Sequence, residues 1–100
     1  MNNWDIGRFY LTSKKYIMEI SSVQKDSRDN IFVELENIRI SYVKQSNRGL
    51  DKDWPEADVL RIQAYRGEGK SLHRGAELPI YDKENINDLI NALTKIAKAL

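Results

Sequence analysis

The C-terminal stretch DKENINDLINALTKIAKAL, residues 82–100, restricts the fold more than any other part of this chain. Its apolar side chains recur at intervals of three and four residues, so they form one stripe along a helix. The stripe consists of Ile86, Leu89, Ile90, Leu93, Ile96 and Leu100. Acidic residues lie early and lysines late, as the helix dipole favours, and Asp82 is a candidate N-cap. The pattern predicts a helix over about residues 83–99, with its stripe packed in the core.

Most residues before that helix alternate between apolar and polar in the manner of strands. Four segments show this alternation: 16–23 (YIMEISSV), 30–43 (NIFVELENIRISYV), 58–66 (DVLRIQAYR) and 71–80 (SLHRGAELPI). In the second segment the alternation slips near Glu36-Asn37, which indicates either one strand with a bulge or two strands joined by a tight bend. Gly75 indicates a bulge in the last segment, and Gly67-Glu68-Gly69 indicates a hairpin turn.

These elements predict an α+β fold, in which an antiparallel sheet of four or five strands carries one C-terminal amphipathic helix packed on one face. One hundred residues form a single domain, 1–100, with strands over about residues 8–80. Residues 44–58 form a long loop without periodicity, and loops of this length are usually functional or mobile. One helix covers only one face, so the other face is solvated or meets a ligand or a second chain. Two-fold dimers are the commonest oligomers, and we expect a homodimer.

Composition excludes several classes of protein. The charged share of 31% and the nine aromatic residues in a hundred argue against a disordered chain, and a net charge of +1 gives no bulk signature of nucleic-acid or membrane binding. The chain contains no cysteine, which excludes disulfides, thiolate metal sites and a cysteine nucleophile. There is no apolar run of about 18 residues and no N-terminal segment of signal-peptide type. We therefore expect a cytoplasmic protein without a membrane segment.

The stretch AYRGEGKS, residues 64–71, fits a relaxed phosphate-loop pattern in which Ala64 replaces the first glycine. A working phosphate loop passes from a strand directly into the N-terminus of a helix. After Ser71, however, Gly75 and Pro79 stand where that helix would have to continue. The pattern is therefore interpreted as a glycine-rich hairpin turn rather than a nucleotide site.

No other constellation indicates catalysis. His73 is the only histidine, so a transition-metal site is not expected, and nothing orients a third member of a triad around it and Ser71. The acidic residues of the long loop are Asp51, Asp53, Glu56 and Asp58, and their spacing lacks the glycine-centred order of a calcium loop. The chain is predicted not to be an enzyme and to need no cofactor or metal.

Basic and aromatic residues gather on the sheet face opposite the apolar alternation and around the glycine turn. The candidates for binding are Arg39, Arg61, Tyr65, Lys70 and Arg74. Arginine and lysine neutralise phosphates, while rings and guanidinium planes stack on unpaired bases. Such a face suits single-stranded DNA or RNA. The alternative is an ordinary polar face, because long arginines commonly decorate exposed strands and Glu34, Glu36 and Glu77 dilute the charge.

The order of strands followed by an amphipathic helix, with a basic glycine turn before the last strand, resembles the PUR-repeat and Whirly families. The local similarity lies in RFYL (8–11), GEGKSLHRGAELPI (67–80) and the helix beginning DKENINDLINAL (82–93). The resemblance implies a curved sheet that binds single-stranded nucleic acid, and domains that pair through helix and sheet. The positions it carries over are Arg39, Arg61, Tyr65, Lys70 and Arg74.

A non-enzymatic protein-binding module is the competing interpretation. A small domain with an exposed loop and a one-sided sheet suits an accessory or inhibitor protein of the kind found in phages and plasmids. In that case Trp54, which stands between Asp53 and Glu56 in the long loop, is the candidate anchor for the partner. The other option for Trp54 is to fold back onto the core.

Overall fold

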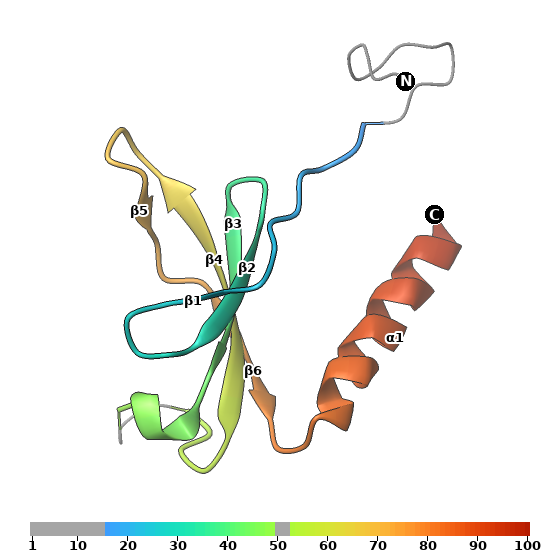
Figure 1. Ribbon diagram of the computed structural model, residues 1–100. Helices are drawn as coiled ribbons and strands as arrows, with labels where there is room; N and C mark the ends of the chain where they lie inside the picture. The colour runs from blue at the N-terminus through green and yellow to red at the C-terminus, as the bar shows by residue number, and fades with distance from the viewer. Residues whose placement is uncertain (1–15, 50–52) are drawn as a thin grey trace.

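The computed structural model describes residues 16–49 and 53–100. Within these ranges the chain forms a curled antiparallel sheet followed by one helix (Figure 1). The elements are β1 (Gln24–Lys25), β2 (Ile31–Leu35), β3 (Ile38–Val43), the 3-10 helix η1 (Gln45–Asn47), β4 (Asp58–Arg66), β5 (Ser71–Leu72), β6 (Ala76–Ile80) and α1 (Glu84–Ala99). The predicted α+β class, with an antiparallel sheet and one C-terminal helix, is confirmed.

The strands follow one another across the sheet in the order β1-β2-β3-β4, and both β5 and β6 pair with the far edge of β4. These last two are one strand interrupted by a bulge. Tyr65 pairs with Leu72 and Ile62 pairs with Ala76, so residues 73–75 lie opposite residues 63–64 only. A Cβ atom on Gly75 would lie 1.6 Å from the Ile62 carbonyl oxygen, so only glycine fits this close approach. The predicted bulge is confirmed.

The phase slip near Glu36-Asn37 marks a tight bend between two strands. Leu35 pairs with Ile38, which leaves Glu36 and Asn37 as a two-residue turn between β2 and β3. Glu36 adopts a φ of 55°, in the left-handed region that short hairpin turns require. The tight-bend alternative is therefore correct. Because the turn holds two residues, the apolar positions of both strands fall on the same side of the sheet.

The register gives the sheet two faces of different chemistry, since residues opposite each other in a ladder point to the same side. The apolar face consists of Ile31, Val33, Leu35, Ile38, Ile40, Tyr42, Leu60, Ile62, Ala64, Ala76, Leu78 and Ile80, with Asp58 beside Ile80 at its end. The polar face consists of Phe32, Glu34, Arg39, Ser41, Val43, Val59, Arg61, Gln63, Tyr65 and Glu77. Each face therefore crosses several strands without a break.

The buried residues lie mostly on the polar face, at the end that the loop after β3 covers. Phe32, Ser41, Val43 and Val59 of that face are buried, and so are Asn30, Ala57 and Ile80 near the same end. On the apolar face only Ile80, at the end of β6, is buried, and Ile31, Ile62 and Leu78 are exposed. The described chain thus leaves its apolar face without a cover.

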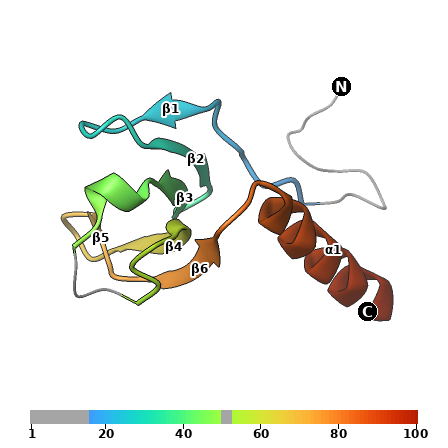
Figure 2. The same cartoon turned by 90° about the horizontal axis from the view of Figure 1, so that it is seen from below.

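Helix α1 does not pack across the sheet, which corrects the predicted arrangement. It leaves the end of β6 and stands away from both faces (Figures 1 and 2), and none of its residues is buried. The connecting turn sets this direction through its own hydrogen bonds. The Asn85 side chain accepts the backbone N–H groups of Tyr81 and Asp82, and the Asp82 carboxylate accepts the N–H of Glu84 at 2.9 Å. Asp82 thus caps the helix start, as predicted.

The first predicted strand is largely absent. Residues 16–23 were expected to form a strand, but the regular pairing there begins with the short β1, and Ile20 makes only one isolated bridge to Leu35. Side chains replace part of the ladder, because the Glu36 carboxylate accepts the Glu19 N–H at 2.7 Å. The expected strand residues 8–15 lie outside the described ranges. Among the described residues, no helix is long and apolar enough to cross a membrane.

Candidate functional site

The polar face is built from cross-strand rows in which acids stand beside arginines. Ser41 pairs with Arg61, and Arg61 pairs in turn with Glu77, so these three lie in one line across β3, β4 and β6. In the next row Arg39 lies between Glu34 and Gln63. The register therefore places a carboxylate next to each of the two strand arginines.

The first cluster holds Arg39 and Tyr65, both predicted to bind nucleic acid. The Arg39 guanidinium lies 3.2 Å from the Glu34 carboxylate and donates to the Tyr65 hydroxyl at 2.7 Å. It also lies 3.9 Å from the centre of the Phe32 ring. The Tyr65 hydroxyl donates to Glu34, and this bond lowers the pKa of Glu34 and raises that of Tyr65. Arg39 and Tyr65 therefore already have partners within the fold.

The second cluster surrounds Glu77. Arg61 donates to its carboxylate through Nε at 2.7 Å, and Arg48 lies 3.5 Å from its other oxygen. The side chain of Arg48 is only 2% exposed. Its guanidinium also donates to the backbone carbonyls of Asp53, Trp54 and Ala57, at 2.6, 2.7 and 2.9 Å. Arg48 thus fixes the long loop over the polar face.

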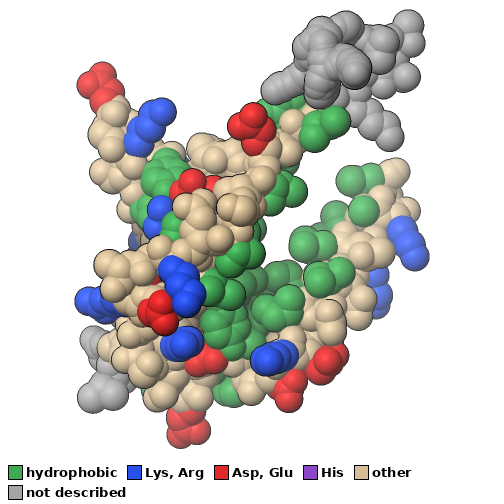
Figure 3. All heavy atoms as spheres, in the orientation of Figure 1, with side chains coloured by type: hydrophobic (Ala, Val, Ile, Leu, Met, Phe, Trp, Pro, Cys, Tyr) green, Lys and Arg blue, Asp and Glu red, His purple; other side chains and the backbone are tan. Residues whose placement is uncertain are grey.

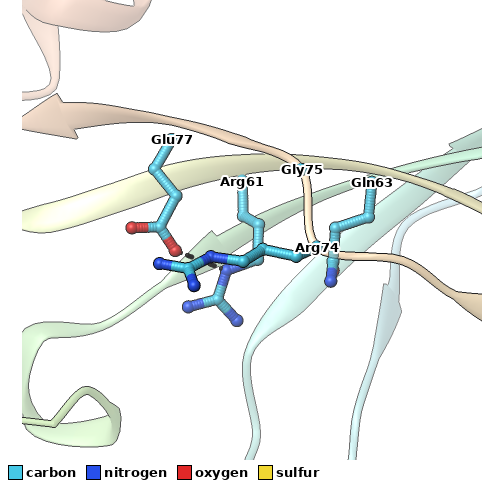
Figure 4. Close-up of a pocket in the computed structure, with 5 residues that line it drawn as sticks. All are labelled: Arg61, Gln63, Arg74, Gly75 and Glu77. Carbon is cyan, nitrogen blue, oxygen red and sulfur yellow. Dashed lines mark hydrogen bonds and ion pairs between the residues drawn. The ribbon is translucent and has the colours of Figure 1, made fainter. Parts of the chain in front are cut away.

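Arg74 brings a third guanidinium to the same place. It comes from the bulge before β6 and extends over the sheet toward Arg61 and Glu77 (Figure 4). With Gln63 and Gly75, these side chains line an open hollow of about 300 Å³. Arg74 makes no ion pair with a carboxylate among the described residues. One carboxylate therefore stands among three guanidinium groups, and the hollow carries an excess of positive charge.

The structure brings together some of the predicted binding residues and separates another. Arg61 and Arg74 share the hollow, and Arg39 with Tyr65 lies on the same face. Lys70 lies apart, at the exposed β4–β5 turn, with a φ of 52°. Ser71 begins β5 rather than a helix, which agrees with the interpretation of AYRGEGKS as a hairpin. Lys70 and the neighbouring Arg66 extend the basic surface along this hairpin.

Trp54, the anchor of the protein-binding interpretation, is 37% exposed. Its φ is 53°, and its carbonyl oxygen is held by Arg48. At the end of the same loop, the Asp58 carboxylate accepts the Tyr42 hydroxyl at 2.6 Å and the Gln45 N–H at 2.7 Å. Burial, followed by this bond to Asp58, raises the pKa of Tyr42 to about 12. These contacts order the loop around a partly exposed Trp54.

Sequence reasoning missed Arg48 and the roles of two glutamates. Arg48 stands in an aperiodic stretch, and no spacing signal distinguishes it from an ordinary loop arginine. From the sequence, Glu34 and Glu77 are only charges that dilute the basic face, whereas in the structure each binds a specific arginine. Alternation does place Arg39, Arg61 and both glutamates on one face. Only the register shows which acid meets which base.

Comparison of this chain with protein-family models, with curated proteins and with solved structures finds no significant match.

Proposed function

We propose that this protein is a non-enzymatic binding protein that holds single-stranded nucleic acid against its polar face, at the hollow between Arg61 and Arg74. The observation that carries the proposal is the convergence of three guanidinium groups on one carboxylate. Arg48 is buried in the loop, so Arg61 and Arg74 are the groups available to a ligand. A cytoplasmic location belongs to the same proposal and agrees with the absence of cysteine.

Phosphate is the chemistry that fits this hollow. Guanidinium groups bind phosphate oxygens with two parallel N–H donors, and a phosphate that meets Arg74 also meets Arg61 beside it. The hollow is open rather than enclosed, which suits a polymer that passes across the sheet. Arg66 and Lys70 lie further along the hairpin and offer additional contacts to the same backbone.

Planar side chains on which unpaired bases can stack lie next to Arg61 and Arg74 on the polar face. The Arg39 guanidinium is already stacked over the Phe32 ring, and the Tyr65 ring lies 5.7 Å from the same guanidinium. Stacking on rings and guanidinium planes tolerates any base, and phosphate contacts carry no sequence information. The expected specificity is therefore for single strands and not for a particular sequence.

The proposal is tested by fluorescence anisotropy with a labelled single-stranded oligonucleotide at several salt concentrations. With three or four phosphate contacts, the log–log slope of affinity against salt should be roughly −2 to −3, at about 0.7 per contact. Arg61→Ala and Arg74→Ala should each weaken binding about tenfold, the equivalent of about 1.4 kcal/mol. Glu77→Gln should strengthen it severalfold, because the competing carboxylate is neutralised while the side-chain shape remains.

Lys95→Ala is the matched control, since it removes one exposed cation from α1, away from the polar face, and should leave affinity unchanged. Equal losses with Lys95→Ala and Arg74→Ala would reduce the effect to bulk charge and contradict the site. If the unaltered protein binds no oligonucleotide at 50 mM salt and ~10 μM protein, the nucleic-acid proposal fails. Protein binding through the Trp54 loop would then be the function to test.

A further inference from the structure

Within the described residues, the chain has two apolar surfaces that are not packed against each other. One is the apolar face of the sheet, on which Ile31, Ile62 and Leu78 are 45%, 39% and 37% exposed. The other is the stripe of α1, on which Ile90, Leu93 and Ile96 are 51%, 56% and 60% exposed. Figure 3 shows apolar side chains on the sheet and on the helix on either side of an open space.

The apolar surface of α1 is wide enough to pack on a sheet. Ile86, Leu89, Leu93, Ile96 and Leu100 follow the 3–4 spacing of a narrow helix–helix seam. Ile90 widens that seam on one side, and small residues such as Ala92 and Ala99 flank it on the other. Charged side chains, including Asp88 and Lys95, keep to the remaining surface. A broad apolar surface with alanines at its margin suits close packing on a flat sheet.

The sheet surface has matching dimensions. The strands β2, β3, β4 and β6 present an apolar area about 14–19 Å across, while a helix with its side chains is about 10–12 Å wide. The 16 residues of α1 extend over about 24 Å, and the nine residues of β4 over about 30 Å. One helix of this kind therefore covers most of one such face.

In the structure, the helix that follows the turn does not cover its own sheet. Asn85 accepts the N–H groups of Tyr81 and Asp82, Asp82 accepts the N–H of Glu84, and the turn that these bonds hold directs α1 away from the face. At the base of the helix, an open hollow of about 390 Å³ includes Leu78 from the sheet and Leu89 from the helix. The two apolar surfaces thus border one continuous space that the described residues, 16–49 and 53–100, do not fill.

We infer that this space is filled by a second copy of the chain, in which each α1 packs on the apolar face of the other copy's sheet. Because both surfaces belong to one sequence, a two-fold axis repeats the contact: the helix of one protomer packs on the sheet of its partner, and the partner's helix packs on the sheet of the first. The exposed apolar parts of both surfaces supply on the order of 600 Å² per chain, close to the roughly 800 Å² of a standard stable interface. The inference does not depend on nucleic-acid binding.

Sedimentation of the full chain gives the first test. At tens of micromolar the mass should be twice 11.6 kDa, and Leu93→Glu should raise the dimer dissociation constant about 100-fold or more, because it brings a charge into an apolar contact. Asn91→Glu adds the same charge on the wet side of the helix and should leave the mass unchanged. A monomer mass for the unaltered protein overturns the inference.

Cross-linking then identifies which surfaces meet, and the absence of native cysteine makes it clean. An Ile62→Cys chain and a longer, tagged Leu93→Cys chain are mixed and treated with a short bismaleimide. The expected product is a covalent heterodimer of intermediate size, whereas Ile62→Cys with Asn91→Cys should give little. A dimer that forms no link between Ile62→Cys and Leu93→Cys overturns the proposed packing.

If something other than a second copy covers the apolar face, the same cysteine variants give different results. A link within one chain of the double variant Ile62→Cys/Leu93→Cys means that the helix closes on its own sheet. A monomer whose Ile62→Cys is shielded from maleimide means that residues 1–15 cover the face. A monomer whose Ile62→Cys reacts at once means that the face awaits a different protein. Each of these results overturns the second copy as the occupant.

Discussion

At the scale of single residues, two side chains, Arg48 and Asp58, each form several hydrogen bonds that hold the loop over the polar face. Arg48 donates to three backbone carbonyls and pairs with Glu77. The Asp58 carboxylate accepts the Tyr42 hydroxyl and the Gln45 N–H. The bond from Tyr42, followed by the Gln45 N–H, lowers the pKa of Asp58 below its ordinary value of 3.8. The ionised form of Asp58 is therefore the one that the folded chain stabilises.

This linkage predicts a pH dependence of stability. A carboxyl whose pKa is lowered by folding contributes stability that is complete above its ordinary pKa and is lost as the pH falls through the folded value. The unfolding free energy of Asp58→Asn should lie below that of the unaltered protein at pH 7 by on the order of 1 kcal/mol. The gap should narrow below about pH 3.8, as urea titrations at pH 7 and pH 2.5 would show. Glu68→Gln, on the exposed hairpin, is the control, and a gap that stays constant with pH contradicts this account.

At the scale of elements, the bulge between β5 and β6 positions the candidate site. The bulge places three residues, 73–75, opposite two residues of β4. Arg74 is the middle residue of the three, and its side chain extends from the bulge toward Arg61 and Glu77 (Figure 4). Gly75 makes the close approach possible, because its backbone lies directly against the Ile62 carbonyl of β4. The strand geometry and the proposed binding site thus depend on the same glycine.

Gly75→Ala should therefore destabilise the fold by roughly 1–3 kcal/mol or more, because its Cβ must displace the backbone of β4. Gly69→Ala is the matched control: a Cβ there would meet only the Ser71 hydroxyl oxygen at 3.9 Å, and the backbone does not require glycine. Denaturant unfolding of both variants makes the comparison. Equal effects of the two substitutions would show that the close approach at Gly75 is absent in solution.

The elements also show how far the sequence alone could lead. Local signals predicted the β4–β5 turn, the bulge at Gly75 and the limits of α1 to within a residue, because each depends on neighbours in the chain. The alternation around Glu36-Asn37 left two solutions, and only the pairing of Leu35 with Ile38 decides between them. Helix packing was predicted wrongly, because amphipathicity shows that a surface needs a cover but not which surface provides it. The ion pair of Arg61 with Glu77 depends on the register between β4 and β6, and the sequence alone does not predict that register.

At the scale of the whole molecule, we propose a different role for each face of the sheet. The polar face carries the loop, most of the buried residues and the hollow proposed for phosphate, whereas the apolar face and α1 are proposed to join two copies. Alternation along β2, β3, β4 and β6 gives each of these strands one set of side chains for each of the two proposed roles. In the proposed dimer the two polar faces point outward, so two strands of nucleic acid could bind without contact between them.

This arrangement makes the stability of the helix stripe depend on protein concentration. In a single chain Leu93 is 56% exposed, so Leu93→Ala should change the unfolding free energy of dilute monomer by less than about 1 kcal/mol. In the dimer the side chain is covered, and the same substitution should cost roughly 2–5 kcal/mol if it is fully buried. Because association adds to stability by mass action, the thermal midpoint of the unaltered protein should also rise with concentration.

Asn91→Ala, on the wet side of α1, is the control, and its effect on the thermal midpoint should be small and the same at every concentration. Thermal unfolding across a hundredfold range of concentration measures all three proteins, and a midpoint that is independent of concentration, with a constant cost for Leu93→Ala, would contradict the shared core.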